Sequence, residues 1–163
     1  MPDSQKKLRI GWFSFTCCED STIIMTELLN DHFFEWKKIL DIRHAKVLKT
    51  KNSLDELDVA FVEGAISSQV QVDKLKKIRS VSKKLIAIGS CAVTGFPSAQ
   101  RNLFNDQTKA EIQHILTKFN YSEKVMKLDE LVQVDAAVPG CPMEADKFLE
   151  VLNQLLQEFG IIK

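Results

Sequence analysis

The stretch that decides the fold is residues 8–15, LRIGWFSF. It is apolar at most positions, which is typical of a strand buried on both faces of a sheet. Ser21 is predicted to be the N-cap of a helix that follows, with an apolar stripe at helical spacing over residues 24–36. A buried strand followed by an amphipathic helix predicts a βα unit.

The same alternation continues along the chain. Further strands are expected at residues 44–48, 59–62, 85–88 and 134–138, and further helices at residues 72–78, 108–119 and 143–159. Regular alternation of strand and helix favours an α/β fold with right-handed crossovers. We therefore predict a flavodoxin-like three-layer sandwich with a parallel sheet in the order 2-1-3-4-5.

Composition narrows the class of protein. The 163 residues contain 22 Lys and Arg against 22 Asp and Glu, and no charge block gathers that would attract nucleic acid or an anionic membrane. No repeat or linker divides the chain, so we expect one domain over residues 1–163. The N-terminal residues do not resemble a signal peptide, and no segment approaches a membrane span. We expect a cytoplasmic protein without direct membrane insertion.

The four cysteines follow the predicted strands. Cys17 and Cys18 come after the first strand, Cys91 after the fourth and Cys141 after the fifth. The carboxyl ends of parallel strands meet at one edge of the sheet, which is where such sheets bind ligands. This arrangement predicts that the four thiols share one site, although any one of them alone is equally well explained as a small buried residue.

The kind of site follows from the spacing. A reducing compartment disfavours disulfides, and structural zinc usually draws on paired Cys-x2–4-Cys knuckles that this chain lacks. A four-iron cluster can take its thiolates from separate loops. Gly64, Gly89 and Gly140 lie beside these loops and would let backbone approach a bulky group. A metal-free, flavodoxin-like interaction protein remains the alternative from a different class.

Four motifs in this order carry a family resemblance: TCCED at residues 16–20, VEGAI at 62–66, IGSCAVTG at 88–95 and VPGCPME at 138–144. They resemble the cluster-bearing domain of [NiFe] hydrogenase small subunits and of their complex I homologue, the 20 kDa subunit. The resemblance implies that Cys18, Cys91 and Cys141 are ligands of one [4Fe-4S] cluster, the proximal one. Full-size small subunits carry two further clusters in a C-terminal region, so we expect a one-cluster version here.

The resemblance also implies partners and a role. The nickel–iron centre would lie in a partner large subunit, and a further iron–sulfur or flavin subunit would exchange electrons with this chain. The chain itself would be a non-catalytic electron-transfer subunit of an oxidoreductase, a hydrogenase.

The first motif departs from the hydrogenase pattern, in which two residues separate two cysteines. Here Cys17 and Cys18 are adjacent, as in complex I. Two interpretations follow: either Cys17 completes the ligand set, which we favour, or Asp20 supplies an oxygen ligand. The tandem pair also supports an alternative function, a complex I-like module that reduces a quinone.

Other polar residues near the motifs have open roles. Glu19 and Glu63 either carry protons or shape the cluster potential, or they are solvated or salt-bridged. Arg101 and Asn102 contact a partner or a cluster sulfur, or simply hold a loop. His32, His44 and His114 are expected away from the cysteines.

Overall fold

The structure, a computed structural model, describes residues 6–163 and contains a five-stranded parallel sheet in the order β2-β1-β3-β4-β5. This confirms the predicted α/β class and strand order. Residues 1–5 of the predicted domain lie outside the described residues. The elements are β1 (Leu8–Ser14), α1 (Asp20–Asp31), α2 (Phe33–Ile39), β2 (Leu40–Ala45), β3 (Leu57–Glu63), α3 (Gln69–Val81), β4 (Ser82–Ile88), α4 (Gly89–Thr94), η1 (Ser98–Leu103), α5 (Asp106–Lys118), η2 (Leu128–Glu130), β5 (Ala136–Val138) and α6 (Ala145–Glu158).

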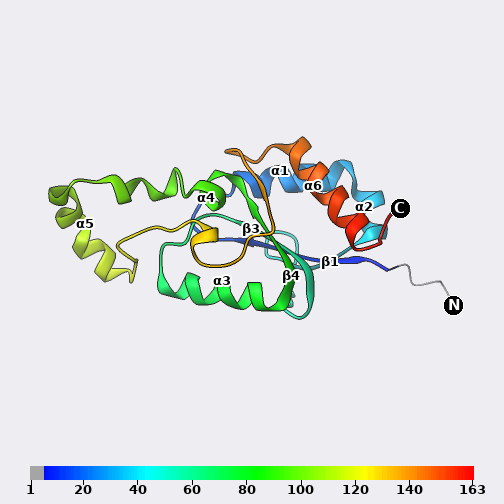
Figure 1. Ribbon diagram of the computed structural model, residues 1–163, viewed down its shortest axis with the longest axis horizontal. Helices are drawn as coiled ribbons and strands as arrows, with labels where there is room; N and C mark the ends of the chain where they lie inside the picture. Colours follow the sequence, from blue (N-terminus) through cyan, green and yellow to red (C-terminus); the bar gives the residue numbers. More distant parts are fainter. Residues whose placement is uncertain (1–5) are drawn as a thin grey trace.

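Helices cover both faces of the sheet, as a three-layer sandwich requires (Figure 1). On one face α1, α2 and α6 pack through Met25, Trp36 and Phe148 against the sheet. On the other face α3 packs through its apolar stripe, whose members Val72, Leu75 and Ile78 are all buried. Because both faces are covered, every residue of the central strand β3 is buried.

The amino end of the sheet is held together by one buried carboxylate. Asp58 on β3 is only 5 % exposed and accepts hydrogen bonds from the Arg9 guanidinium and the Arg9 backbone N–H on β1. It also accepts one from Lys83 Nζ on β4, at 2.8 Å. These cationic donors hold the pKa of Asp58 well below its usual range, although burial opposes them. Three neighbouring strands are thereby tied together at this end.

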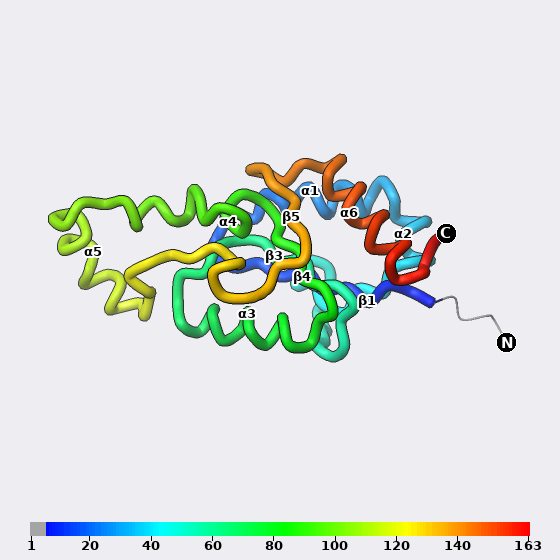
Figure 2. Tube along the Cα trace, in the orientation of Figure 1, coloured from blue at the N-terminus to red at the C-terminus, as the bar shows by residue number. Residues whose placement is uncertain are grey.

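An arm extends past the carboxyl ends of the strands. The chain from α4 through η1 and α5, green to yellow in Figure 2, runs out beyond the sheet and returns. Of the residues of α5, only Leu116 is buried. Asn102 joins the outgoing and returning segments, since its side chain donates to Val125 O at 2.7 Å and accepts from Val125 N–H at 2.8 Å.

The second strand differs from the prediction. Residues 44–48 were expected to form it, but β2 spans Leu40–Ala45, and Leu48 N–H bonds back to Ala45 O in a turn. Helix α2 ends at Ile39 and β2 begins at the next residue, with no Gly or Pro between them. No local signal therefore marks the change from helix to strand.

The predicted cap and the single first helix are also wrong. Ser21 lies inside α1, and the residue before the helix is Glu19, whose φ of 63° is left-handed and whose side chain makes no cap bond. The predicted helix is broken at His32 into α1 and α2. In addition, residues 89–94 of the IGSCAVTG motif form the short helix α4, where a loop was expected.

Within residues 6–163, no helix combines the length and the apolar character needed to cross a membrane.

Candidate metal centre

All four cysteines line one depression at the carboxyl ends of the strands. Cys17 and Cys18 follow β1, Cys91 lies in the first turns of α4, and Cys141 follows β5. Cys91 is buried, Cys17 is half-buried, and Cys18 and Cys141 are exposed. The depression is completed by Asp20, Ser21, Glu63, Ile88, Gly89, Ser90, Gly140 and Pro142. The site therefore opens at the molecular surface.

Two glycines let the backbones of two cysteine loops meet. Gly89 has φ +77°, and an added Cβ would lie 2.9 Å from Ser21 Oγ. Gly140 has φ +110°, and an added Cβ would collide with the carbonyl oxygen of Pro142. Their closeness allows Ser90 N–H to donate to Gly140 O at 2.7 Å. Only glycine adopts these conformations without strain, so the loops after β4 and β5 are fixed against one another.

Glu63 organises the start of α1 from the end of β3. Its carboxylate accepts Ser21 N–H at 3.1 Å and the Thr22 hydroxyl at 2.6 Å. It thus satisfies a free N–H of the helix N-terminus in place of a capping side chain. Burial raises the pKa of Glu63, and the two hydrogen bonds oppose that rise. At 3 % exposure, the residue is not the solvated surface group that one sequence interpretation allowed.

Two of the four thiols, Cys17 and Cys18, are poor nucleophiles in this arrangement. Burial raises the pKa of Cys17 to about 12, and the neighbouring Glu63 carboxylate adds to the rise. The pKa of Cys18 is also raised, because the Asp20 side chain and burial outweigh the opposing Asp20 N–H. Reactive cysteines need lowered pKa values. These two need a strong positive charge nearby to become thiolates, and bound iron supplies such a charge.

The donor set fits a cluster better than a single ion. Within residues 6–163, no group of three or more His, Cys, Asp or Glu side chains converges on the site of one ion. In a [4Fe-4S] cluster each of four thiolates binds its own iron, so the donors stand around the group rather than at one point. Four thiols around one depression, without a Lys, Arg or His in its lining, meet that requirement.

Two serines were not predicted as site residues: Ser98 was not singled out, and Ser21 was predicted only as a helix N-cap. Ser98 Oγ lies 3.2 Å from Cys91 Sγ and 3.0 Å from Thr16 O, so its one proton is shared between these acceptors and is available to a Cys91 thiolate. Ser21 is buried, and its hydroxyl accepts Met143 N–H at 3.1 Å, joining α1 to the loop after β5. Neither lies at a position that motif spacing marks, because the contacts depend on how separate loops fold together.

The other predicted residues are distributed around the site. Asp20, Glu63, Gly89 and Gly140 line the depression, whereas Glu19 and Gly64 do not. Gly64, with φ +93°, turns the chain at the end of β3 so that Ala65 and Thr16 exchange backbone hydrogen bonds.

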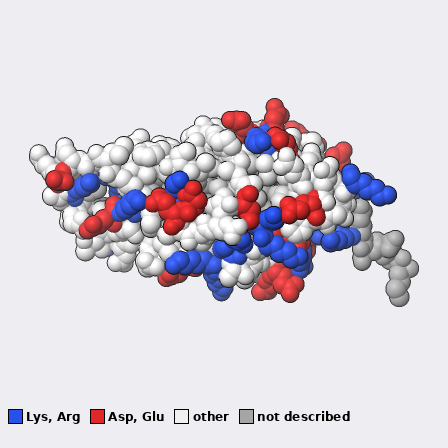
Figure 3. Space-filling view, viewed as in Figure 1, with Lys and Arg blue, Asp and Glu red and all other residues white. Residues whose placement is uncertain are grey.

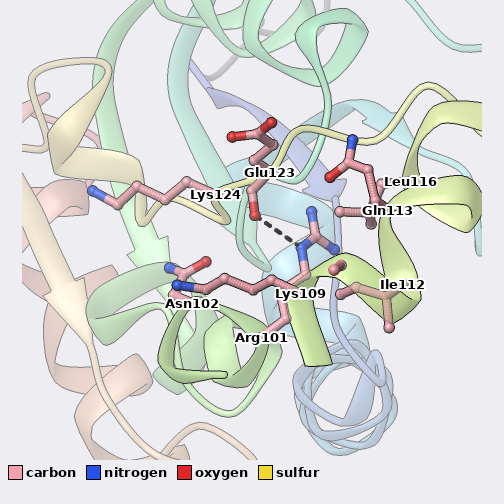
Figure 4. Close-up of a pocket in the computed structure, with 9 residues that line it drawn as sticks. Arg101, Asn102, Lys109, Ile112, Gln113, Leu116, Glu123 and Lys124 are labelled. Carbon is pink, nitrogen blue, oxygen red and sulfur yellow. Dashed lines mark hydrogen bonds between the residues drawn. The ribbon is translucent and has the colours of Figure 1, made fainter. Parts of the chain in front are cut away.

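Arg101 and Asn102 hold the two segments of the arm together through hydrogen bonds. Arg101 donates to the backbone carbonyls of Ser122 and Glu123, and Figure 4 shows the second of these bonds. The two residues also line a cavity of about 460 Å³ between η1, α5 and the returning segment, which none of the cysteines reaches. The structure thus uses both residues to hold a loop.

Comparison with known proteins gives the family. The model of the family described as NADH ubiquinone oxidoreductase, 20 Kd subunit, matches residues 17–155. The chain is 31 % identical over 166 residues to the NAD-reducing hydrogenase HoxS subunit delta of Cupriavidus necator, covering 92 % of this chain and 79 % of that protein. It is 28 % identical over 148 residues to the sulfhydrogenase 2 subunit delta of Pyrococcus furiosus, covering 89 % of this chain and 60 % of that protein.

A solved structure shares the fold. The chain superposes on a chain of the crystal structure of NAD+-reducing [NiFe]-hydrogenase in the H2-reduced state with a TM-score of 0.81 and 23 % identity. The match covers 93 % of this chain and 92 % of that one. This likeness extends over the sheet, the covering helices and the arm.

Proposed function

The chain belongs to the NADH ubiquinone oxidoreductase 20 Kd subunit family, and from this membership we propose that it is the electron-transfer small subunit of a [NiFe] hydrogenase. It holds one [4Fe-4S] cluster and relays electrons between a nickel–iron large subunit and a further iron–sulfur or flavin subunit. The observation that carries the proposal is the gathering of all four cysteines around one depression. Two relatives are named as hydrogenase subunits, which supports the choice.

The chain's own residues position and tune the group. Cys17, Cys18, Cys91 and Cys141 supply the thiolates. Ser98 donates to the Cys91 sulfur, and hydrogen bonds to ligand sulfurs raise the potential of a cluster. When bound, the cluster supplies one-electron redox chemistry. The polypeptide contributes no catalytic residue and works as one cluster-binding domain over residues 1–163.

Cys17 completes the ligand set in this proposal, rather than Asp20. It is half-buried, packs against the small cluster that contains Cys91, and lines the depression together with the other three cysteines. Asp20 instead lies in the first turn of α1, where its negative charge stabilises the helix by interacting with the positive end of the helix dipole. Iron content separates the two: Cys17→Ser is expected to lose iron, whereas Asp20→Ala retains it. The opposite result would assign the fourth ligand to Asp20.

A partner subunit covers the open side of the site. Cys18 and Cys141 are exposed, and the neighbouring arm displays exposed apolar side chains, among them Phe96, Leu103 and Phe104. Figure 3 shows the upper edge of the arm as largely uncharged, while acidic and basic groups are mixed elsewhere on that face. We call the exposed apolar residues Phe96, Leu103 and Phe104 the rim, and exposed apolar side chains beside an open site suit a protein partner. We assign this rim to the large subunit and place the complex in the cytoplasm.

Electron paramagnetic resonance tests the proposed function. Anaerobically purified protein reduced with dithionite should show the signal of a reduced [4Fe-4S] cluster at about one spin per chain. Assembled with its large subunit, the chain should give the same signal under hydrogen gas. If dithionite reduces the cluster but hydrogen does not reduce it in that complex, the hydrogenase assignment is contradicted. The cluster assignment would still stand.

The tandem cysteines favour a second candidate, a complex I-like module that reduces a quinone. The description of the matching family, a subunit of NADH ubiquinone oxidoreductase, agrees with it. Reoxidation separates the candidates: rapid oxidation of the reduced cluster by a short-chain quinone, in the absence of hydrogenase activity, would favour the second.

A further inference from the structure

A second cavity lies beside the cysteine depression, at the carboxyl ends of β1 and β2. Its volume is about 390 Å³, within the range of small-molecule sites. It is lined by Trp12, Phe13, Ser14, Glu19, Thr22, His44, Lys46, Val47 and Lys74. None of the cysteines reaches it, and the turn that begins α1 separates the two hollows.

Three basic side chains meet at this cavity without an acidic partner. Lys46 follows β2, His44 is the next-to-last residue of β2, and Lys74 comes from α3. Within residues 6–163, neither lysine forms an ion pair or a hydrogen bond; the Lys74 ammonium lies 5.2 Å from the centre of the Phe15 ring. The one carboxylate in the lining, Glu19, belongs to an exposed residue and is not paired with either.

The basic groups act on each other across the cavity. The pKa of Lys74 is lowered by burial and by the charge of Lys46. The pKa of His44 is lowered by burial and by the charges of Lys74, Lys46 and Lys49, with a hydrogen bond to Trp12 O opposing. Gathering unpaired cations in a half-buried place costs stability unless an anion binds among them. Asp58 shows the contrasting case of a buried charge that is paired, with Arg9 and Lys83.

The tautomer of His44 leaves one ring nitrogen free to be protonated when an anion binds. Its Nδ1 lies 3.1 Å from Trp12 O, and a carbonyl oxygen only accepts, so Nδ1 carries the proton. The second ring nitrogen of the neutral imidazole is left to take up a proton. The ring is fixed by stacking on Phe13, with centroids 4.3 Å apart.

We propose that this cavity binds a small phosphate-bearing molecule, with Lys74 and Lys46 paired to the phosphate and His44 hydrogen-bonded to it. Two ammonium groups and an imidazolium match a phosphate's charge and its several acceptor oxygens. Ser14 adds a hydroxyl to the lining. The volume exceeds that of a bare phosphate, which leaves room for an organic part. The cavity lies beyond carboxyl strand ends, on the side of the sheet where doubly wound folds bind ligands, next to the switch point between β1 and β3.

This inference does not rest on the hydrogenase assignment, and calorimetry tests it on the cluster-loaded protein. Inorganic phosphate and a phosphate monoester, glycerol 3-phosphate, are titrated in turn, with chloride at equal ionic strength as the reference. Saturable binding is expected. Equal affinities would identify free phosphate as the ligand, and tighter binding of the ester would identify an organic phosphate.

Lys74→Met tests the contact while keeping an apolar stem. It should weaken binding about tenfold or more, as expected when one charged hydrogen bond is lost. The matched control is Lys76→Met, an exposed lysine on the same helix that does not line the cavity, with affinity kept within about twofold. Lys46→Met is a second variant at an exposed position, so that a folding defect in one does not decide the outcome.

Nuclear magnetic resonance of His44 gives an independent readout. Phosphate should raise the pKa of the His44 imidazole in the wild type, against the charges of Lys46, Lys49 and Lys74, which lower it. The negative charge of Glu19 acts in the same direction as the phosphate, and the rise should be smaller in Lys74→Met. The proposal would be overturned if neither probe bound saturably. It would also be overturned if Lys74→Met and Lys46→Met both bound the probes as tightly as the wild type. Iron content is measured on the same samples, so failure here is distinguishable from failure of the cluster assignment.

Discussion

The two ends of β3 each carry a buried carboxylate, and the two are treated in opposite ways. Asp58, at the amino end, is paired with the cations Arg9 and Lys83, and its pKa is lowered. Glu63, at the carboxyl end, is bonded only to neutral donors, and its pKa is raised. The chain compensates charge fully at the end that holds the strands together. At the other end it leaves thiols and unpaired charge that a bound group must compensate.

The largest expected effect is at the paired end. Asp58→Asn leaves Arg9 and Lys83 without their common partner, and it should lower the free energy of unfolding by about 2–4 kcal/mol. Urea unfolding of the metal-free protein measures this. Glu56→Gln removes an exposed carboxylate from the same arginine and should cost less than about 1 kcal/mol. Equal losses in both variants would contradict the importance of the buried partner.

Gly140→Ala should have the next largest effect, at the open end. The new methyl group collides with Pro142 O in a left-handed backbone, so unfolding should become easier by about 1–3 kcal/mol and iron should be lost. Gly160→Ala is the control, because φ is +65° there but nothing lies within 4 Å of the added carbon. If both variants behaved alike, backbone conformation rather than the clash would be responsible.

The two ends should respond to pH in opposite directions in the metal-free protein. The pKa of Asp58 is lower folded than unfolded, so its stabilisation is present above the ordinary pKa of 3.8 and is lost as pH falls below it. The pKa of Cys17 is raised from 9.0 to about 12, so stability falls as pH rises between these values, by at most about 1.4 kcal/mol per pH unit. Thermal melts across both ranges check the signs. Stability that rose above pH 9 would contradict the environment assigned to Cys17.

The smallest effect concerns the link between Glu63 and Cys17. Glu63→Gln removes a negative charge but keeps a hydrogen-bonding side chain of the same size, so it should lower the pKa of Cys17 only in part, because burial is the larger cause. The pH dependence of thiol alkylation, in a metal-free variant with Cys17 as its sole cysteine, measures this. An unchanged pKa of Cys17 would show that the charge of Glu63 does not act on that thiol.

The sequence was sufficient for the sheet. Runs such as VAFV and LIAI are buried on both faces, and their spacing by amphipathic helices led to the observed order. The edge strand β2 pairs only with β1, and three of its residues, Asp41, Ile42 and Arg43, are only half-buried. With two charged residues among these three, the strand lacks the continuous apolar run that marks β3 and β4, and it was misplaced.

Less of the site than of the sheet could be predicted from the sequence. The positions of the cysteines after β1, β4 and β5 followed from parallel topology alone. Glu63 as a cap for α1, and Ser98 beside Cys91, depend on contacts between loops and have no signature in spacing. The phosphate cavity was missed for the same reason, since Lys74 and His44 come from elements that meet only in the folded chain.

Iron and acid-labile sulfide per chain, measured on anaerobically purified protein, test the central claim most directly. About four of each are expected. Both should be lost in Cys91→Ser, while the melting temperature of that variant's metal-free form stays close to that of the metal-free wild type. A wild-type protein reconstituted under anaerobic conditions that still contained no iron would contradict the claim that the open end of the sheet is built for a cluster.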